Sequence, residues 1–139
     1  MFSNPPNSEI RSILTESKTI AVVGISDRED RASKYVSEYM QREGYTIYPV
    51  NPRLDEWNGL KVYDSVAEVP AQIDIVNVFR RSSEVLPPAR DAVVADAKVL
   101  WLQQGIFNEQ AADIVDQAGI RAIMNSCIMV EHKSMKLGF

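Results

Sequence analysis

Short apolar runs alternate along the chain with longer segments whose apolar residues recur at helical spacing. Residues 19–23, Thr-Ile-Ala-Val-Val, show no polar alternation, which is typical of a strand covered on both faces of a parallel sheet. Similar runs predict further strands at 45–50, 74–79, 98–102 and 121–124. The helical spacing predicts a first helix that Asn7 or Ser8 caps. It predicts further helices at 33–43, at 83–96, after Asn108, and briefly in the tail after Cys127.

Local signals refine the ends of these elements. Asn108 is predicted to cap the helix that follows it. Ser65 and Glu68 have the spacing of a capping box, which predicts a brief helix there. Pro49 has no amide hydrogen, so its strand is predicted to fray or end at that residue. Residues 54–61 are predicted to form a loop.

The order of these elements predicts the fold class. Strand and helix alternate five times with short connections, and no linker or low-complexity stretch interrupts the 139 residues. This alternation predicts one α/β domain over residues 1–139, with its core at about 10–133: a Rossmann-like, doubly wound, five-stranded parallel sheet with helices on both faces. Ligands bind outside the carboxyl ends of the strands in such sheets.

Composition and charge argue against several classes of protein. A net charge of −4 argues against a dedicated nucleic-acid binder, and no apolar run approaches the roughly 20 residues of a membrane span. The polar first residues carry no secretory signal, and a single cysteine, Cys127, fits a reducing cytoplasm. With one cysteine and one histidine, no metal site is expected. His132 beside Glu131 is interpreted as a surface pair without a catalytic role.

The residues that follow the predicted strands are polar and cationic. These triplets are Gly24-Ile25-Ser26, Asn51-Pro52-Arg53, Phe79-Arg80-Arg81, Gln103-Gln104-Gly105 and Asn125-Ser126-Cys127. They contain no carboxylate or histidine for acid–base catalysis, whereas small residues, amides and arginines suit a phosphorylated ligand. Each triplet alone could be an ordinary turn, but all five strand ends converge on one edge of the sheet.

The first two strand ends bear on the identity of the ligand. Gly24 lets the backbone turn sharply and approach a ligand, and the amides of the turn and helix start suit a pyrophosphate. The turn reads Gly-Ile-Ser-Asp-Arg-Glu and lacks the second and third glycines of an NAD fingerprint. Arg53 stands where an NAD site has an acid, and Lys34 adds a second cation. This pattern favours a phosphorylated ribose, as in NADP or coenzyme A (CoA).

Several motifs in order resemble the small, stand-alone CoA-binding proteins, which are similar to the CoA-binding domain of the succinyl-CoA synthetase alpha subunit. They are Ala21-Val22-Val23-Gly24-Ile25-Ser26, Gly44-Tyr45, Tyr48-Pro49-Val50-Asn51-Pro52, Asp74-Ile75-Val76, Val78-Phe79-Arg80-Arg81, Trp101-Leu102-Gln103-Gln104-Gly105-Ile106 and Cys127-Ile128-Met129-Val130-Glu131-His132. The resemblance covers about residues 10–133. The synthetase's second domain, with its phosphorylated histidine, has no counterpart here, so ligase activity is not implied.

The resemblance implies a Rossmann-like fold that binds CoA, or an acyl-CoA, through its ADP part. It implies that Gly24, Ile25 and Ser26 lie along the phosphates. It further implies that Lys34 and Arg53 neutralise phosphate charge. The rest of the implied site comprises Pro49, Asn51 and Pro52 at the nucleotide wall, Phe79 and Arg80 beside the ligand, and Gln104 and Gly105 facing the pantetheine arm.

These expectations favour a CoA-binding module that catalyses no reaction of its own. One alternative is an NADP-dependent oxidoreductase, although the missing glycines and the lack of a substrate domain count against it. Another is a CoA-linked redox carrier in which Cys127 forms a mixed disulfide with the CoA thiol. A subunit that lends its CoA site to a separate catalytic chain would expose an apolar patch around Trp57 or Phe107. Binding to a partner protein or to a second copy of the chain stays open.

Overall fold

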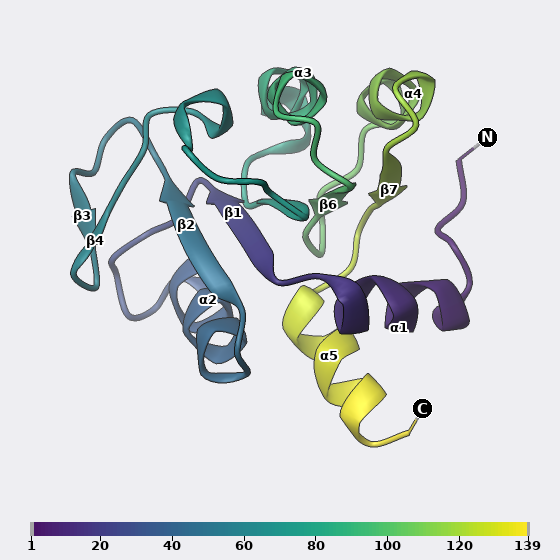
Figure 1. Ribbon diagram of the computed structural model, residues 1–139, viewed down its shortest axis with the longest axis horizontal. Coiled ribbons are helices and arrows are strands. Elements are labelled where there is room, and N and C mark those ends of the chain that lie inside the picture. The colour runs from purple at the N-terminus through teal and green to yellow at the C-terminus, as the bar shows by residue number, and fades with distance from the viewer. Residues whose placement is uncertain (1, 139) are drawn as a thin grey trace.

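The centre of the fold is a five-stranded parallel sheet between two layers of helices, seen in a computed structural model that describes residues 2–138 (Figure 1). The strands of this sheet are β1 (Thr19–Val23), β2 (Thr46–Val50), β5 (Ile75–Val78), β6 (Val99–Leu102) and β7 (Arg121–Ile123). The helices are α1 (Asn7–Glu16), α2 (Ala32–Arg42), α3 (Leu86–Val94), α4 (Glu109–Gln117) and α5 (Ile128–Lys136). Helices α3 and α4 cover one face of the sheet, and α1, α2 and α5 cover the other.

The strand order is β2-β1-β5-β6-β7, and every neighbouring pair is parallel. The chain runs from β1 outward to β2 and then crosses back to place β5 on the other side of β1. The direction of winding therefore reverses between β1 and β5, where doubly wound sheets bind their ligands. The predicted Rossmann-like fold, with five parallel strands and helices on both faces, is confirmed.

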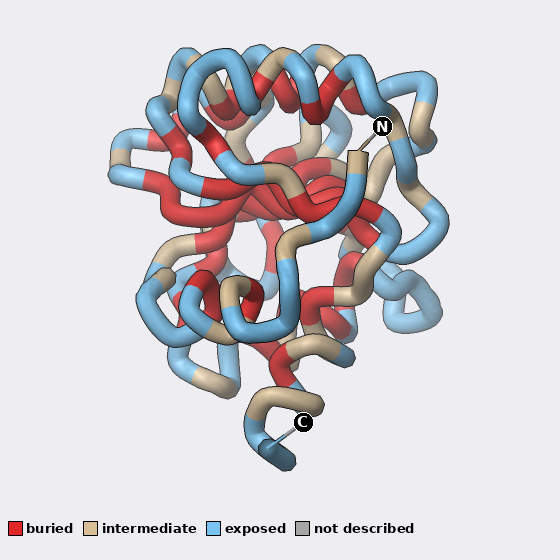
Figure 2. Tube along the Cα trace, turned by 90° about the vertical axis from the view of Figure 1, so that its right-hand side faces the viewer, coloured by how far each residue is buried: buried red, intermediate tan, exposed pale blue. Residues whose placement is uncertain are grey.

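The sheet separates two apolar cores. Along β1, Ala21 and Val23 pack on the side of α3 and α4, whereas Ile20 and Val22 pack on the side of α1, α2 and α5. Figure 2 shows the buried residues concentrated along the sheet and the inner sides of the helices. Because both faces are covered, the strand has no reason to alternate polar and apolar residues. Full burial of each such valine or isoleucine contributes about 1.5–3 kcal/mol.

Strand β2 continues through Pro49 and ends at Val50, so the predicted fraying at the proline is wrong. Strand β2 lies at the edge of the sheet, and the Pro49 carbonyl accepts a hydrogen bond from the Tyr63 amide at 2.9 Å on its outer side. The missing amide hydrogen of Pro49 therefore faces the edge, where the sheet needs no donor.

The predicted loop at 54–61 is instead a small hairpin. Strands β3 (Glu56–Trp57) and β4 (Leu60–Lys61) pair antiparallel around Asn58 and Gly59, whose φ angles are 47° and 82°. Asn-Gly between two short strands is the strongest local signal for a tight hairpin turn, and the sequence prediction overlooked it.

Two of the predicted helix caps are wrong, and one is confirmed. Helix α1 begins after Pro6, so Asn7 and Ser8 lie inside its first turn. The brief helix at Val66–Glu68 is a 3₁₀ turn, and the Glu68 carboxylate accepts from the Asp64 amide at 3.1 Å instead of completing a box with Ser65. The Asn108 side chain does cap α4, since it accepts from the Ala111 amide at 3.0 Å.

A polar cluster joins α2 to α5. His132 is only 6% exposed, and its Nδ1 lies 2.8 Å from the Tyr39 hydroxyl, so the predicted surface pair with Glu131 is wrong. The Glu43 carboxylate lies 4.0 Å from the same nitrogen and 2.7 Å from the Lys136 ammonium. Burial lowers the pKa of His132, opposed by Glu43 and assisted by Lys136.

The burial of His132 predicts a loss of stability in mild acid. As the pH falls below 6.5, the ordinary histidine value, the unfolded chain takes up a proton before the folded protein does, so the free energy of unfolding decreases. In a His132→Phe variant this decrease between pH 6.5 and about 5 is expected to flatten. Urea denaturation at several pH values measures it, and identical slopes for both proteins would contradict the prediction. Glu43 also has a lowered pKa, but its contribution is lost only below its ordinary value of 4.5.

Candidate functional site at the carboxyl edge of the sheet

Three adjoining hollows follow the carboxyl ends of β1, β2, β5 and β6, and together we call them the carboxyl groove. The arginine hollow, of about 600 Å³, is lined by Gly24, Asn51, Pro52, Arg53, Arg80, Arg81, Ser83, Glu84 and Pro87. The loop hollow, of about 500 Å³, is lined by Gly24, Ile25, Ser26, Asp27, Arg28, Arg31, Ala32, Ser33, Asn51, Arg53, Leu54 and Phe79. The apolar hollow, of about 380 Å³, is lined by Ala32, Tyr35, Val36, Phe79, Gln103, Gln104, Ile106, Cys127, Met129 and Val130. The hollows adjoin one another, since they share lining residues.

Gly24 allows the main chain to form the floor of the groove. Its φ is +82°, and a Cβ atom built there would lie 2.9 Å from the Phe79 carbonyl oxygen and 3.3 Å from Cγ of Arg80. The Gly24 amide donates to the Val50 carbonyl at 2.9 Å, and the Phe79 amide donates to the Val23 carbonyl at 2.9 Å. The ends of β1, β2 and β5 are thus held together, and the absence of a side chain on Gly24 lets the turn approach the end of β5 closely.

Side chains from three other elements hold the turn after β1 in place. The Asn51 amide group donates to the Ile25 carbonyl at 2.8 Å. The Trp57 indole nitrogen donates to the Ser26 carbonyl at 2.9 Å, and the Ser33 hydroxyl accepts from the Ser26 amide at 2.9 Å. Trp57 is fully buried, so no exposed apolar patch lies there, whereas Phe107, the other place considered for such a patch, is 50% exposed. The contributions of Trp57 and Ser33 were not predicted, although the Asn-Gly hairpin could have located Trp57.

The groove is rich in arginine. Arg53 lines both the arginine hollow and the loop hollow, with Arg80 and Arg81 in the former and Arg28 and Arg31 in the latter. Helix α2 also begins at the loop hollow, where the first amides of a helix have no intrahelical acceptor and its dipole favours anions. Carboxylates in these two linings are limited to Asp27 and Glu84. The surroundings therefore suit a ligand with several negative charges.

The family described as "CoA binding domain" matches residues 18–133 of this chain. The chain belongs to this CoA-binding family. The matched range contains β1, the turn at Gly24 and every residue that lines the carboxyl groove. The groove is therefore part of the segment that defines membership of the family.

Relatives of two sizes are similar to this chain. The uncharacterized protein YneT of Bacillus subtilis is 49% identical over 135 residues, which cover 97% of this chain and 100% of YneT. A trans-feruloyl-CoA synthase, FCS1, from an unknown prokaryotic organism is 41% identical over 120 residues, which cover 84% of this chain but 17% of the synthase. The chain thus spans the whole of one relative and under a fifth of the other.

Solved structures repeat this division. A hypothetical protein from Pyrococcus horikoshii superimposes with a TM-score of 0.92 at 35% identity, covering 98% of this chain and 99% of that one. A dinucleotide-forming acetyl-coenzyme A synthetase 1 from Ca. Korarchaeum cryptofilum, in complex with phosphate and ADP, superimposes with a TM-score of 0.72 at 27% identity. The match covers 78% of this chain but 26% of the synthetase chain. The predicted resemblance to small CoA-binding proteins and to the CoA-binding domain of a synthetase is confirmed.

Most of the predicted site residues lie together in the groove. Those in the linings are Gly24, Ile25, Ser26, Asn51, Pro52, Arg53, Phe79, Arg80, Gln104 and Cys127. Pro49 is buried within β2, outside these linings. The exposed Gly105 lies beside the apolar hollow, where its amide donates to the Asn125 side chain at 2.7 Å. The redox role of Cys127 stays a prediction.

Lys34 is the predicted cation that the structure places elsewhere. Its side chain is 7% exposed, and its ammonium lies 2.8 Å from the Glu38 carboxylate and 3.0 Å from that of Glu29. Hydrogen bonds to Glu38 and then Glu29 raise the pKa of Lys34. Two carboxylates already balance this ammonium. Arg28 and Arg31, which the sequence prediction did not single out, line the groove, and Arg28 also lies 3.3 Å from the Asp30 carboxylate. A role for Lys34 in neutralising phosphate stays a prediction.

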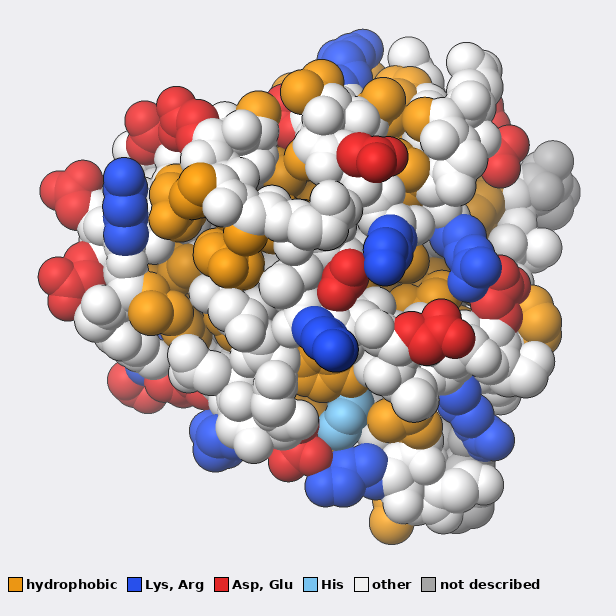
Figure 3. All heavy atoms as spheres, in the orientation of Figure 1, with side chains coloured by type: hydrophobic (Ala, Val, Ile, Leu, Met, Phe, Trp, Pro, Cys, Tyr) orange, Lys and Arg blue, Asp and Glu red, His pale blue; other side chains and the backbone are white. Residues whose placement is uncertain are grey.

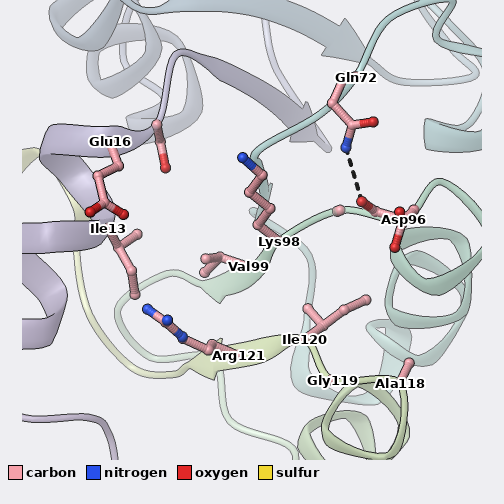
Figure 4. A pocket seen from close by; sticks show the side chains of 12 residues that line it. Ile13, Glu16, Gln72, Asp96, Lys98, Val99, Ala118, Gly119, Ile120 and Arg121 are labelled. Carbon is pink, nitrogen blue, oxygen red and sulfur yellow. Dashed lines mark hydrogen bonds between the residues drawn. The ribbon is translucent and has the colours of Figure 1, made fainter.

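A further hollow, of about 500 Å³, lies at the opposite, amino edge of the sheet (Figure 4). Its cations are engaged: Lys98 lies 3.5 Å from the Asp74 carboxylate, and Arg121 lies 3.2 Å from that of Glu9. Gly119 in its wall has no atom within 4 Å of a built Cβ, so the main chains do not approach closely as they do at Gly24. This hollow lacks the features that suit the carboxyl groove to phosphates.

Two other kinds of site, a metal centre and a membrane span, concern residues 2–138. Within this range, no group of three or more histidine, cysteine or acidic residues is placed to hold a metal ion. Within the same range, none of the helices has the length and apolar character needed to cross a bilayer. On the face that Figure 3 shows, acidic and basic side chains are interspersed among apolar and uncharged ones. The carboxyl groove is therefore the candidate site.

Proposed function

We propose that this protein binds coenzyme A, or an acyl-CoA, in the carboxyl groove through the ADP part of the ligand, and that it catalyses no reaction of its own. The proposal rests on the turn at Gly24, where main chain without a side chain meets the groove and arginines stand on both sides. Family membership supports CoA as the ligand. The pyrophosphate lies along the turn and the start of α2, and the phosphate on the ribose lies near Arg53.

The chemistry of the groove supports binding rather than catalysis. Histidine is absent from the described residues that line the three hollows, and the acids Asp27 and Glu84 are exposed. His132 belongs to α5 and contacts Tyr39 of α2, outside the linings. A general acid or base needs to be held near the reacting group, usually by a third residue, and no such set faces the groove. The groove is therefore suited to holding CoA rather than to transforming it.

The wild-type protein is expected to distinguish CoA from its analogues. Loss of a charge-assisted contact to the ribose phosphate predicts that dephospho-CoA binds about 10- to 100-fold more weakly than CoA. Isothermal titration calorimetry with CoA, dephospho-CoA and NADPH measures this difference. Equal affinities for CoA and dephospho-CoA would contradict the place given to the ribose phosphate. Binding of NADPH with no binding of CoA would favour the oxidoreductase alternative instead.

A further inference from the structure

The apolar hollow differs in chemistry from the rest of the carboxyl groove. Its lining contains no charged residue, whereas arginines line both other hollows. Two lining side chains at its rim are large, apolar and exposed: Tyr35 of α2 at 47% and Val130 of α5 at 54%. Met129, beside Val130, is an unbranched and adaptable side chain. A surface of this kind suits an apolar group that comes from solution.

The apolar hollow adjoins the proposed phosphate site. Ala32, the first residue of α2, and Phe79, at the end of β5, line both the loop hollow and the apolar hollow. A ligand with its pyrophosphate on the turn at Gly24 therefore has a path past Phe79 into an uncharged space. The lining thus changes from arginine-rich to uncharged along the groove. An acyl-CoA changes in the same order, from its charged phosphates to its uncharged acyl group.

The polar groups of the apolar hollow lie where they suit the pantetheine arm rather than the end of the ligand. The arm carries two amides, which lose affinity if they are buried without hydrogen-bond partners. Gln104 is exposed and can serve them, while the buried Gln103 side chain already donates to Asn77 at 2.6 Å. Val36, Ile106, Met129 and Val130 form a wall of apolar side chains. This wall suits methylene groups.

We propose that the apolar hollow receives the acyl group of a CoA thioester, so that the preferred ligand is an acyl-CoA with an apolar acyl chain rather than free CoA. This inference rests on the proposed function, because it needs the ADP part to lie in the other two hollows. Tyr35 from α2 and Val130 from α5 close on the acyl chain, and Phe79 separates it from the phosphates.

The test compares CoA, acetyl-CoA and hexanoyl-CoA by calorimetry on three proteins. Wild type is expected to bind hexanoyl-CoA about tenfold more tightly than CoA, with acetyl-CoA between them. Val130→Glu puts a charge at the rim and is expected to weaken the binding of hexanoyl-CoA more than that of CoA, so that the preference is lost. Val94→Glu is the matched control, since Val94 is a 74% exposed valine on α3 outside the hollow. It is expected to retain the preference.

Each other outcome overturns the inference in a recognisable way. If CoA binds but hexanoyl-CoA binds no more tightly, the acyl site is absent while the proposed function stands. If Val130→Glu weakens CoA and hexanoyl-CoA by the same factor, the hollow holds the pantetheine arm instead. If none of the three ligands binds wild type, the proposed function fails as well. Tyr35→Glu charges the opposite rim, and it is expected to repeat the result of Val130→Glu if the latter does not fold.

Discussion

Replacing Gly24 with alanine is expected to lower the free energy of unfolding by about 2–4 kcal/mol and to abolish measurable CoA binding. Two costs combine at this position. The φ of +82° is unfavourable for any residue with a Cβ, and the new methyl would lie 2.9 Å from the Phe79 carbonyl oxygen. That oxygen belongs to the main chain at the end of β5, so it moves only if the edge of the sheet moves. The same shift would displace the turn proposed to contact the pyrophosphate.

Gly59→Ala is the matched control for this prediction. Gly59 has the same φ of +82°, but no atom lies within 4 Å of a Cβ built there. The control variant is therefore expected to lose only the free energy of unfolding that comes from the unfavourable φ, about 1–2 kcal/mol, and to bind CoA normally. Urea denaturation and calorimetry on both variants measure the two effects. If both variants lost the same free energy of unfolding, the close approach between the ends of β1 and β5 would add nothing to the effect of Gly24→Ala on stability.

Replacing Arg53 with alanine is expected to weaken CoA binding about 10- to 100-fold, because a hydrogen bond to a charged group contributes about 1.5–3 kcal/mol. Arg53 is the arginine that lines both the loop hollow and the arginine hollow, so it reaches the place proposed for the ribose phosphate. Its main chain is held, since its amide donates to the Asn51 side chain at 2.9 Å. The variant should therefore lose a charge without losing the shape of the groove.

The readout specific to Arg53 is the ratio of the affinities for CoA and dephospho-CoA. If Arg53 contacts the ribose phosphate, the variant loses affinity for CoA but little for dephospho-CoA, and the ratio falls toward one. Arg90→Ala is the control, because Arg90 is an exposed arginine of α3 outside the linings of the groove. Equal losses for both ligands would place Arg53 near the pyrophosphate, and increasing salt should weaken its effect.

The order of strands and helices was predictable because it depends on local patterns. Continuous apolar runs such as Ile20 to Val23 are typical of strands covered on both faces, and parallel strands bring their carboxyl ends to one edge. Gly24, Asn51, Arg53 and Phe79 were therefore predicted to lie close together, and they line adjoining hollows. The errors at this level, such as the hairpin around Asn58, came from a local signal that was overlooked.

The side-chain partners could be determined only by the tertiary structure. The sequence by itself determined which residues follow each strand, because apolar runs and helical spacing are patterns of neighbouring residues. It did not determine that Trp57 would hold the Ser26 carbonyl, 31 residues away, or that His132 would meet Tyr39, 93 residues away. It likewise did not determine that Glu29 and Glu38 would engage Lys34, leaving Arg28 and Arg31 in the groove. Such contacts depend on how whole elements pack. A local pattern marks a residue as buried or polar, but it does not say which distant residue will contact it.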